Sequence, residues 1–148
     1  MRKFILVDID HTLSNASWRD VLIGGPEGWD HYHAQSVHDA AHQEAITFVN
    51  ALASQYTIIG ITARPEKWRT ITQRWLYKNS ANVGMILMRP DDAFHPAPQI
   101  KWDLAEKAFN FPDQGSVNNI AFIIEDRTDV CDFFFGKGIS SLQIRNAK

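Results

Sequence analysis

Residues 4–12 read FILVDIDHT, and this stretch decides the fold. Its first four residues form a continuous apolar run, and Asp8 and Asp10 follow directly. A continuous run, rather than an alternating one, is typical of a strand buried on both faces of a parallel sheet. Alternate residues of a strand share a face, so the two carboxylates can converge if the strand continues through them.

Further apolar runs recur along the chain, and segments with helical spacing separate them. The later predicted strands are Thr57–Ile61, Met85–Met88, Ile120–Ile124 and Ser140–Ile144. The predicted helices are His38–Gln55, a segment from Pro65 through Leu76, Lys101–Phe109 and Thr128–Gly136. This alternation predicts an α/β fold, a doubly wound and mainly parallel sheet with right-handed crossovers. Residues 1–148 are expected to form one domain, with loops or small insertions at Ser14–His38 and Arg89–Gln99.

Composition limits the classes of protein that the chain can belong to. Apolar residues make up 45% and charged residues 22%, which is the balance of an ordinary globular domain. The single cysteine, Cys131, excludes an internal disulfide and suits a reducing, cytoplasmic location. The net charge of −2 makes the whole molecule a poor nucleic-acid binder, so any such contact is expected to be local. No membrane span, signal peptide or obligate protein partner is expected.

Polar residues follow the predicted strands at the edge where ligands bind in open α/β sheets. Asp8 and Asp10 are hard oxygen ligands that suit Mg²⁺, or they simply end a strand in a turn. Thr62 and Arg64 suit a phosphate, although Thr62 alone is equally consistent with a helix cap. Glu125 and Asp126 end a buried strand, where carboxylates are costly unless they are paired or bound to metal, and Asp126 can alternatively cap a helix. Lys101, taken alone, is an ordinary solvated lysine.

The order of these residues along the chain indicates a class of protein more specifically than any one residue does alone. An acid pair, a threonine, a lysine and a second acid pair, spread over Phe4–Ile144, resemble the four motifs of the haloacid dehalogenase (HAD) superfamily. The resemblance implies the following catalytic roles: Asp8 as nucleophile, Asp10 as general acid and base, Thr62 as phosphoryl ligand and Lys101 as charge stabiliser. It also implies Mg²⁺ held by Asp8, the Asp10 backbone carbonyl and Asp126 or Glu125, with Asp126 preferred. The first motif usually has glycine where this chain has His11, which raises a question about the loop geometry there.

Two segments narrow the resemblance. Ile123–Val130 and the Thr62-Ala63-Arg64 turn are similar to the 3′-phosphatase domain of phage polynucleotide kinase/phosphatase. That domain has an essential arginine after its first motif, and Arg19 stands at a matching spacing from Asp10. By this resemblance Arg19, Arg64 and Thr12 are expected to bind the substrate.

The substrate is expected to be a nucleotide. Both insertions are too short for a large lid, so the site is expected to be open. Residues 64–78 hold five basic residues and one acidic residue, a net charge of +4, which is either a solvated helix face or a track for a nucleic-acid backbone. Aromatic side chains in Ser14–His33 either anchor that insertion or stack on a base.

We therefore predict a Mg²⁺-dependent phosphomonoesterase that works through a phospho-aspartyl intermediate. The 3′-phosphate ends of DNA or RNA are preferred as substrate over free mononucleotides. A non-catalytic phosphate-binding or nucleic-acid-binding module is the alternative class, but a binder needs no nucleophile. A linked kinase activity has no support, because the chain lacks a Walker-type glycine-lysine loop.

Overall fold

The computed structural model describes residues 2–25, 27–109 and 118–147. Its centre is a five-stranded sheet in the order β5-β4-β1-β6-β7, in which every neighbouring pair is parallel. The strands are β1 (Phe4–Val7), β4 (Thr57–Pro65), β5 (Ile86–Arg89), β6 (Ile120–Glu125) and β7 (Ser141–Gln143). The predicted doubly wound parallel sheet is therefore confirmed.

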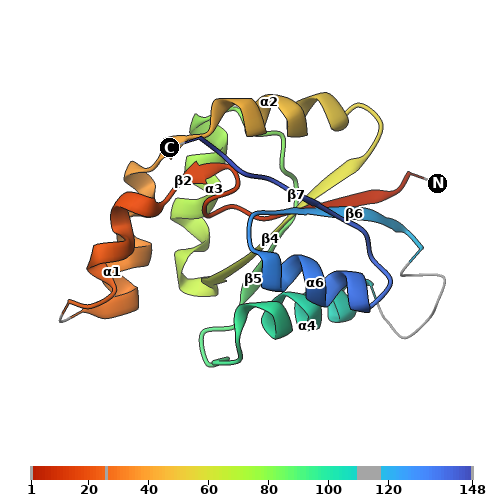
Figure 1. Ribbon diagram of the computed structural model, residues 1–148. Helices are drawn as coiled ribbons and strands as arrows, with labels where there is room; N and C mark the ends of the chain where they lie inside the picture. Colours follow the sequence, from red (N-terminus) through yellow and green to blue (C-terminus); the bar gives the residue numbers. More distant parts are fainter. Residues whose placement is uncertain (1, 26, 110–117, 148) are drawn as a thin grey trace.

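Helices cover both faces of this sheet (Figure 1). The helices α2 (Gln43–Leu52) and α3 (Arg69–Lys78) pack on one face, and α4 (Ala97–Phe109) and α6 (Thr128–Gly136) pack on the other. The central strand β1 contributes Ile5 and Val7 to the first core and Leu6 to the second, as alternation on a strand requires. All three side chains are fully buried, so β1 is fixed from both sides.

The insertion after β1 is folded rather than loop-like. It contains β2 (Ser14–Asn15), η1 (Ser17–Leu22), α1 (Gly28–Ala34), η2 (Gln35–His38) and β3 (Ala40–Ala41). The strands β2 and β3 pair antiparallel at its base and bring its two ends together. The helix predicted from His38 is wrong at its start, because residues 38–41 belong to this insertion and α2 begins at Gln43.

Further element boundaries differ from the sequence prediction. Strand β4 continues to Pro65 because β5 pairs with it that far, Pro65 opposite Arg89. The short helix η3 (Glu66–Trp68) then precedes α3, so the helix does not start beside Thr62. Helix α4 starts at Ala97, which places Lys101 in its second turn. None of the helices in the described parts of the chain is long and apolar enough to cross a membrane.

Candidate active site

The ends of β1, β4 and β6 open onto one cavity of about 930 Å³. Parallel strands carry their carboxyl ends to one edge, so polar residues that follow different strands meet there. Six of the predicted site residues line this cavity: Asp8, Asp10, Thr62, Arg64, Lys101 and Asp126. The other three, Thr12, Arg19 and Glu125, are fully buried and do not line it. The structure therefore brings all nine together, in two layers.

Lys101 lies between two carboxylates. Its Nζ donates to Asp8 Oδ1 at 2.7 Å and to Glu125 Oε2 at 2.6 Å. Burial alone would lower the pKa of Lys101, but Asp8 and Glu125 raise it above its usual range, so the ammonium stays charged. Lys101, which taken alone would be an ordinary solvated lysine, is therefore buried between two acids as their counter-ion.

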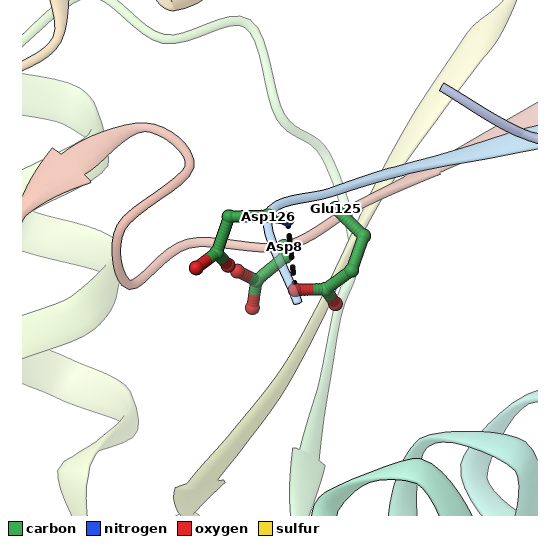
Figure 2. A group of neighbouring side chains, drawn as sticks. All are labelled: Asp8, Glu125 and Asp126. Carbon is green, nitrogen blue, oxygen red and sulfur yellow. Dashed lines mark hydrogen bonds between the residues drawn. The ribbon is translucent and has the colours of Figure 1, made fainter. Parts of the chain in front are cut away.

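Asp8, Glu125 and Asp126 converge at the ends of β1 and β6 (Figure 2), and one oxygen from each lies within 4.8 Å of the others. Three hard carboxylate oxygens at this separation fit Mg²⁺. Both oxygens of Glu125 already accept hydrogen bonds, Oε2 from Lys101 and Oε1 from the backbone N–H groups of Asp126 and Arg127. Asp126 Oδ1 accepts only the Thr12 hydroxyl, at 3.2 Å, among the described hydrogen bonds. The preference for Asp126 over Glu125 as metal ligand thus has a structural reason.

The protonation of the second acid pair follows from this crowding. Burial and the neighbouring Asp8 raise the pKa of Asp126 to about 6. Burial and Asp8 also raise the pKa of Glu125, although Lys101 opposes the shift. A divalent cation at this position would favour the ionised form of both groups.

Thr12 forms hydrogen bonds with two of the acids. Its hydroxyl lies 2.8 Å from Asp8 Oδ2 and 3.2 Å from Asp126 Oδ1, and the residue is fully buried. The expected binding of substrate by Thr12 stays a prediction, and the structure shows the Thr12 hydroxyl in contact with two carboxylates.

Asp10 is clamped by two arginines. Arg64 donates to it from Nε at 3.1 Å and from Nη2 at 2.7 Å, and Arg19 donates from Nη2 at 2.7 Å. Burial would raise the pKa of Asp10, but the charges and hydrogen bonds of Arg64 and Arg19 outweigh it and hold the pKa well below its usual range. Asp10 is therefore an ionised carboxylate in the absence of substrate.

The two arginines differ in their surroundings. Arg64 lines the cavity, and its other contact is Nη1 with the Thr72 hydroxyl at 3.0 Å. Its backbone N–H donates to the Thr62 hydroxyl oxygen at 3.1 Å, so the β4 end is locally ordered around both residues. Arg19 does not line the cavity, and its Nη2 donates to Asp10 from within the insertion.

Asp39 holds Arg19 in place, and sequence reasoning missed it. The Asp39 carboxylate accepts Nε of Arg19 at 2.8 Å and Nη2 at 2.7 Å, with both side chains fully buried. Arg19 Nη1 donates to the Tyr32 carbonyl at 2.9 Å. Trp18 Nε1 also donates to Asp39, at 2.9 Å. No sequence motif identifies Asp39. It could have been found only by reasoning that a buried Arg19 requires a carboxylate partner, supplied by its own insertion.

The loop after β1 adopts the geometry that the sequence left open. His11 has φ of 65°, in the left-handed region, which histidine tolerates better than most residues. The Asn146 side chain donates to the carbonyls of His11 and Thr12, each at 3.0 Å. The usual glycine is therefore not needed for this loop to form.

The fold is that of HAD-like hydrolases of known structure, and the acid cluster lies at the edge of its central sheet. A family model described as the polynucleotide kinase PNKP phosphatase domain matches residues 2–148, and the chain belongs to that family. No curated protein shows a significant match.

Solved structures agree with this fold. A chain of the Pnkp1/Rnl/Hen1 complex has a TM-score of 0.76 at 21% identity, covering 100% of this chain and 47% of that one. This protein thus spans under half the length of that chain. A haloacid dehalogenase-like protein from Streptococcus pneumoniae has a TM-score of 0.68 at 16% identity, with coverages of 97% and 85%. A HAD enzyme from Bacteroides thetaiotaomicron, in complex with magnesium and inorganic phosphate, has a TM-score of 0.60 at 13% identity, with coverages of 100% and 96%.

Proposed function

We propose that this protein is a Mg²⁺-dependent phosphomonoesterase that removes 3′-phosphates from DNA or RNA ends through a phospho-aspartyl intermediate on Asp8. The observation that carries the proposal is the contact of Lys101 with Asp8 and Glu125, beside Asp126, on one wall of the cavity. A module that only binds phosphate would not need three acids beside the bound anion. A phosphatase needs them, one as its nucleophile and the others for its metal site.

The chain's own residues account for both chemical steps. An Asp8 carboxylate oxygen attacks phosphorus, the bond to the 3′ oxygen breaks, and a proton from Asp10 goes to the departing oxygen. Water then attacks the acyl phosphate, Asp10 takes the water's proton, and Asp8 leaves with inorganic phosphate released. Lys101 and Arg64 offset the negative charge of the phosphoryl group throughout, and the Thr62 hydroxyl contacts it.

Asp10 must gain a proton for the first step, although its two arginines keep it ionised without substrate. Arg64 borders the cavity although its side chain is buried, and in the proposed mechanism an incoming phosphate dianion competes with Asp10 for its guanidinium. Loss of the Arg64 contact removes one of the two cations that lower the pKa of Asp10, so that pKa rises. Arg19 stays in place because Asp39 and the Tyr32 carbonyl hold it. We infer that substrate binding itself makes Asp10 a competent acid.

Mg²⁺, bound by Asp8, Asp126 and the Asp10 backbone carbonyl, would neutralise phosphate charge and so allow a carboxylate to approach phosphorus. Glu125 would then act mainly as the partner of Lys101 and of two backbone N–H groups.

Free mononucleotides are the second candidate substrate, and α3 separates the two. Arg74 and Lys78 are exposed on α3, and Arg69 is held by Glu66 through two hydrogen bonds of 2.7 Å. None of these residues lines the cavity. A mononucleotide bound at Asp8 cannot use this helix face, whereas a longer strand can follow it.

The decisive experiment is a substrate panel with Mg²⁺. It compares oligonucleotides phosphorylated at the 3′ or the 5′ end, free 3′- and 5′-mononucleotides, and sugar phosphates. We expect the highest kcat/KM for the 3′-phosphorylated oligonucleotide. In an Arg74→Gln/Lys78→Gln variant, its logarithmic salt dependence should weaken by about 0.7 for each lost phosphate contact. A preference for mononucleotides, or an unchanged salt dependence, would favour the second candidate.

A further inference from the structure

Two exposed aromatic side chains line the same cavity as Asp8, and the proposed chemistry uses neither. Trp29 on α1 is 59% exposed, and Phe94 in the loop between β5 and α4 is 87% exposed. Large apolar side chains exposed in a cavity with a polar centre are typical of a site for a ligand with an apolar part.

The Trp29 ring packs against other aromatic side chains of α1. Its ring stacks on His33 at 5.9 Å and meets Tyr32 edge-on at 5.2 Å. Tyr32 in turn packs against the Arg19 guanidinium, 4.3 Å from the ring centre. The ring therefore has a defined orientation while most of the residue stays accessible. Trp18 differs, because it does not line the cavity and its Nε1 donates to Asp39.

Phe94 lies on a loop that Arg89 braces. Arg89 Nε donates to the Ala63 carbonyl at 2.8 Å, and Nη1 donates to the carbonyls of Ala93 and His95, at 3.0 and 2.9 Å. Arg89 also lines the cavity, and among the described ion pairs no carboxylate is its partner. This wall thus combines an exposed ring with a positive charge.

Lys67 joins the two segments. Its Nζ pairs with Asp30, next to Trp29, at 2.6 Å, and its backbone N–H donates to Asp91 at 3.0 Å. Both acids line the cavity, so these contacts offset negative charge at its rim. They also place the segments that carry Trp29 and Phe94 on either side of one residue.

We propose that Trp29 and Phe94 form a nucleobase subsite for the terminal nucleoside of the substrate, an inference that rests on the proposed function. The base of the nucleotide that carries the scissile 3′-phosphate is planar and uncharged, which suits two exposed rings. Aromatic stacking tolerates every base, so the subsite selects a nucleoside without selecting a sequence.

The test compares two oligonucleotides that end in the same 3′-phosphate, one with a normal terminal nucleotide and one with an abasic terminal residue. We expect Trp29→Ala and Phe94→Ala each to raise KM about tenfold for the normal substrate, with kcat unchanged. Neither variant should alter KM for the abasic substrate. Trp29→Phe should restore most of the affinity, because it keeps a ring. The matched control is Phe135→Ala, an exposed phenylalanine on α6 outside the cavity.

The outcomes separate the subsite from the proposed function. Equal KM changes for both substrates, or no change for either, would refute the nucleobase subsite while leaving the phosphatase intact. A wild-type protein that hydrolyses neither oligonucleotide would refute the proposed function, and the subsite with it. Thermal melts of each variant identify any loss of folding, and Phe94→Ala, in an exposed loop, provides the arm least affected by it.

Discussion

Lys101 and Asp8 have opposite effects on the charge of the site, and so their removal should have opposite effects on stability. The positive charge of Lys101 reduces the repulsion between the carboxylates of Asp8, Glu125 and Asp126. We expect Lys101→Met to lower the free energy of unfolding by about 3–5 kcal/mol, because three crowded acids lose their cation. Asp8→Asn should leave the free energy of unfolding unchanged or higher, since Lys101 keeps Glu125 as its partner.

Urea unfolding in the presence of chelator measures both effects, and a phosphatase assay completes the comparison. Asp8→Asn should reduce turnover to the background rate, because an amide is a poor nucleophile. Hydrolysis above background by a clean Asp8→Asn preparation would contradict the proposed nucleophile.

Asp39 has no contact with the cavity, yet it orients Arg19 toward Asp10. We expect Asp39→Asn to lower kcat at least tenfold with little change in KM, and to destabilise the fold by about 3 kcal/mol. Asp132→Asn, an exposed aspartate on α6, is the matched control. The pH profile of kcat distinguishes the role: a displaced Arg19 should shift the limb that reports Asp10, whereas a purely structural defect would leave the profile in place.

At the scale of elements, α1 contains a titratable core residue. His33 is 7% exposed, and its burial lowers its pKa to about 4. The unfolded chain takes up a proton as pH falls below about 6.5, whereas folded His33 stays neutral until about pH 4. This residue alone should therefore lower the free energy of unfolding by about 2 kcal/mol between pH 7 and pH 5.

Urea unfolding at the two pH values checks this expectation. His33→Gln should remove that part of the pH dependence, whatever its effect on absolute stability. The exposed His38 on η2 gives the control variant, His38→Gln, which should keep the wild-type pH dependence. An identical pH dependence in His33→Gln and wild type would rule out a neutral, buried His33.

The strands of the central sheet were predictable because continuous apolar runs have few alternative structures. Strand β1 matches its prediction at both ends, Phe4 and Val7. The end of β4 was not predictable from the sequence. Residues 62–65 become strand only through pairing with β5, a contact that local sequence does not encode. Within α2 the structure buries Ile46 and Val49, whereas Phe48 is 43% exposed.

The site was predictable where residues follow strands, and less so within the insertion. Asp8, Thr62 and Asp126 meet because parallel strands share an edge. Asp39 and Trp29 are brought to the site by an insertion with no simple apolar period, so their positions depend on tertiary contacts.

At the scale of the whole molecule, metal binding links the site to pH. A Mg²⁺ ion bound at Asp126, as proposed, would have to displace a proton from that carboxyl near or below about pH 6. We expect the Mg²⁺ affinity to fall about tenfold between pH 7 and pH 5, as measured by calorimetric titration. Asp126→Asn should abolish this change and weaken binding at both pH values.

Activity should follow the same metal requirement. Excess chelator should abolish turnover, and Ca²⁺ should not restore it, because Ca²⁺ prefers longer bonds and more ligands than Mg²⁺. Full activity in chelator would contradict a metal site at Asp8 and Asp126.

The central position of β1 also bears on how the protein is made. Its neighbours, β4 and β6, come from positions about 50 and 115 residues further along the chain, so its pairings are mostly non-local. During synthesis Asp8 emerges before Lys101 and Asp126, which reach it only once most of the domain has left the ribosome. The proposed hydrolytic activity therefore requires the completed sheet, because a nascent chain that stops before β6 lacks the second acid pair of the site.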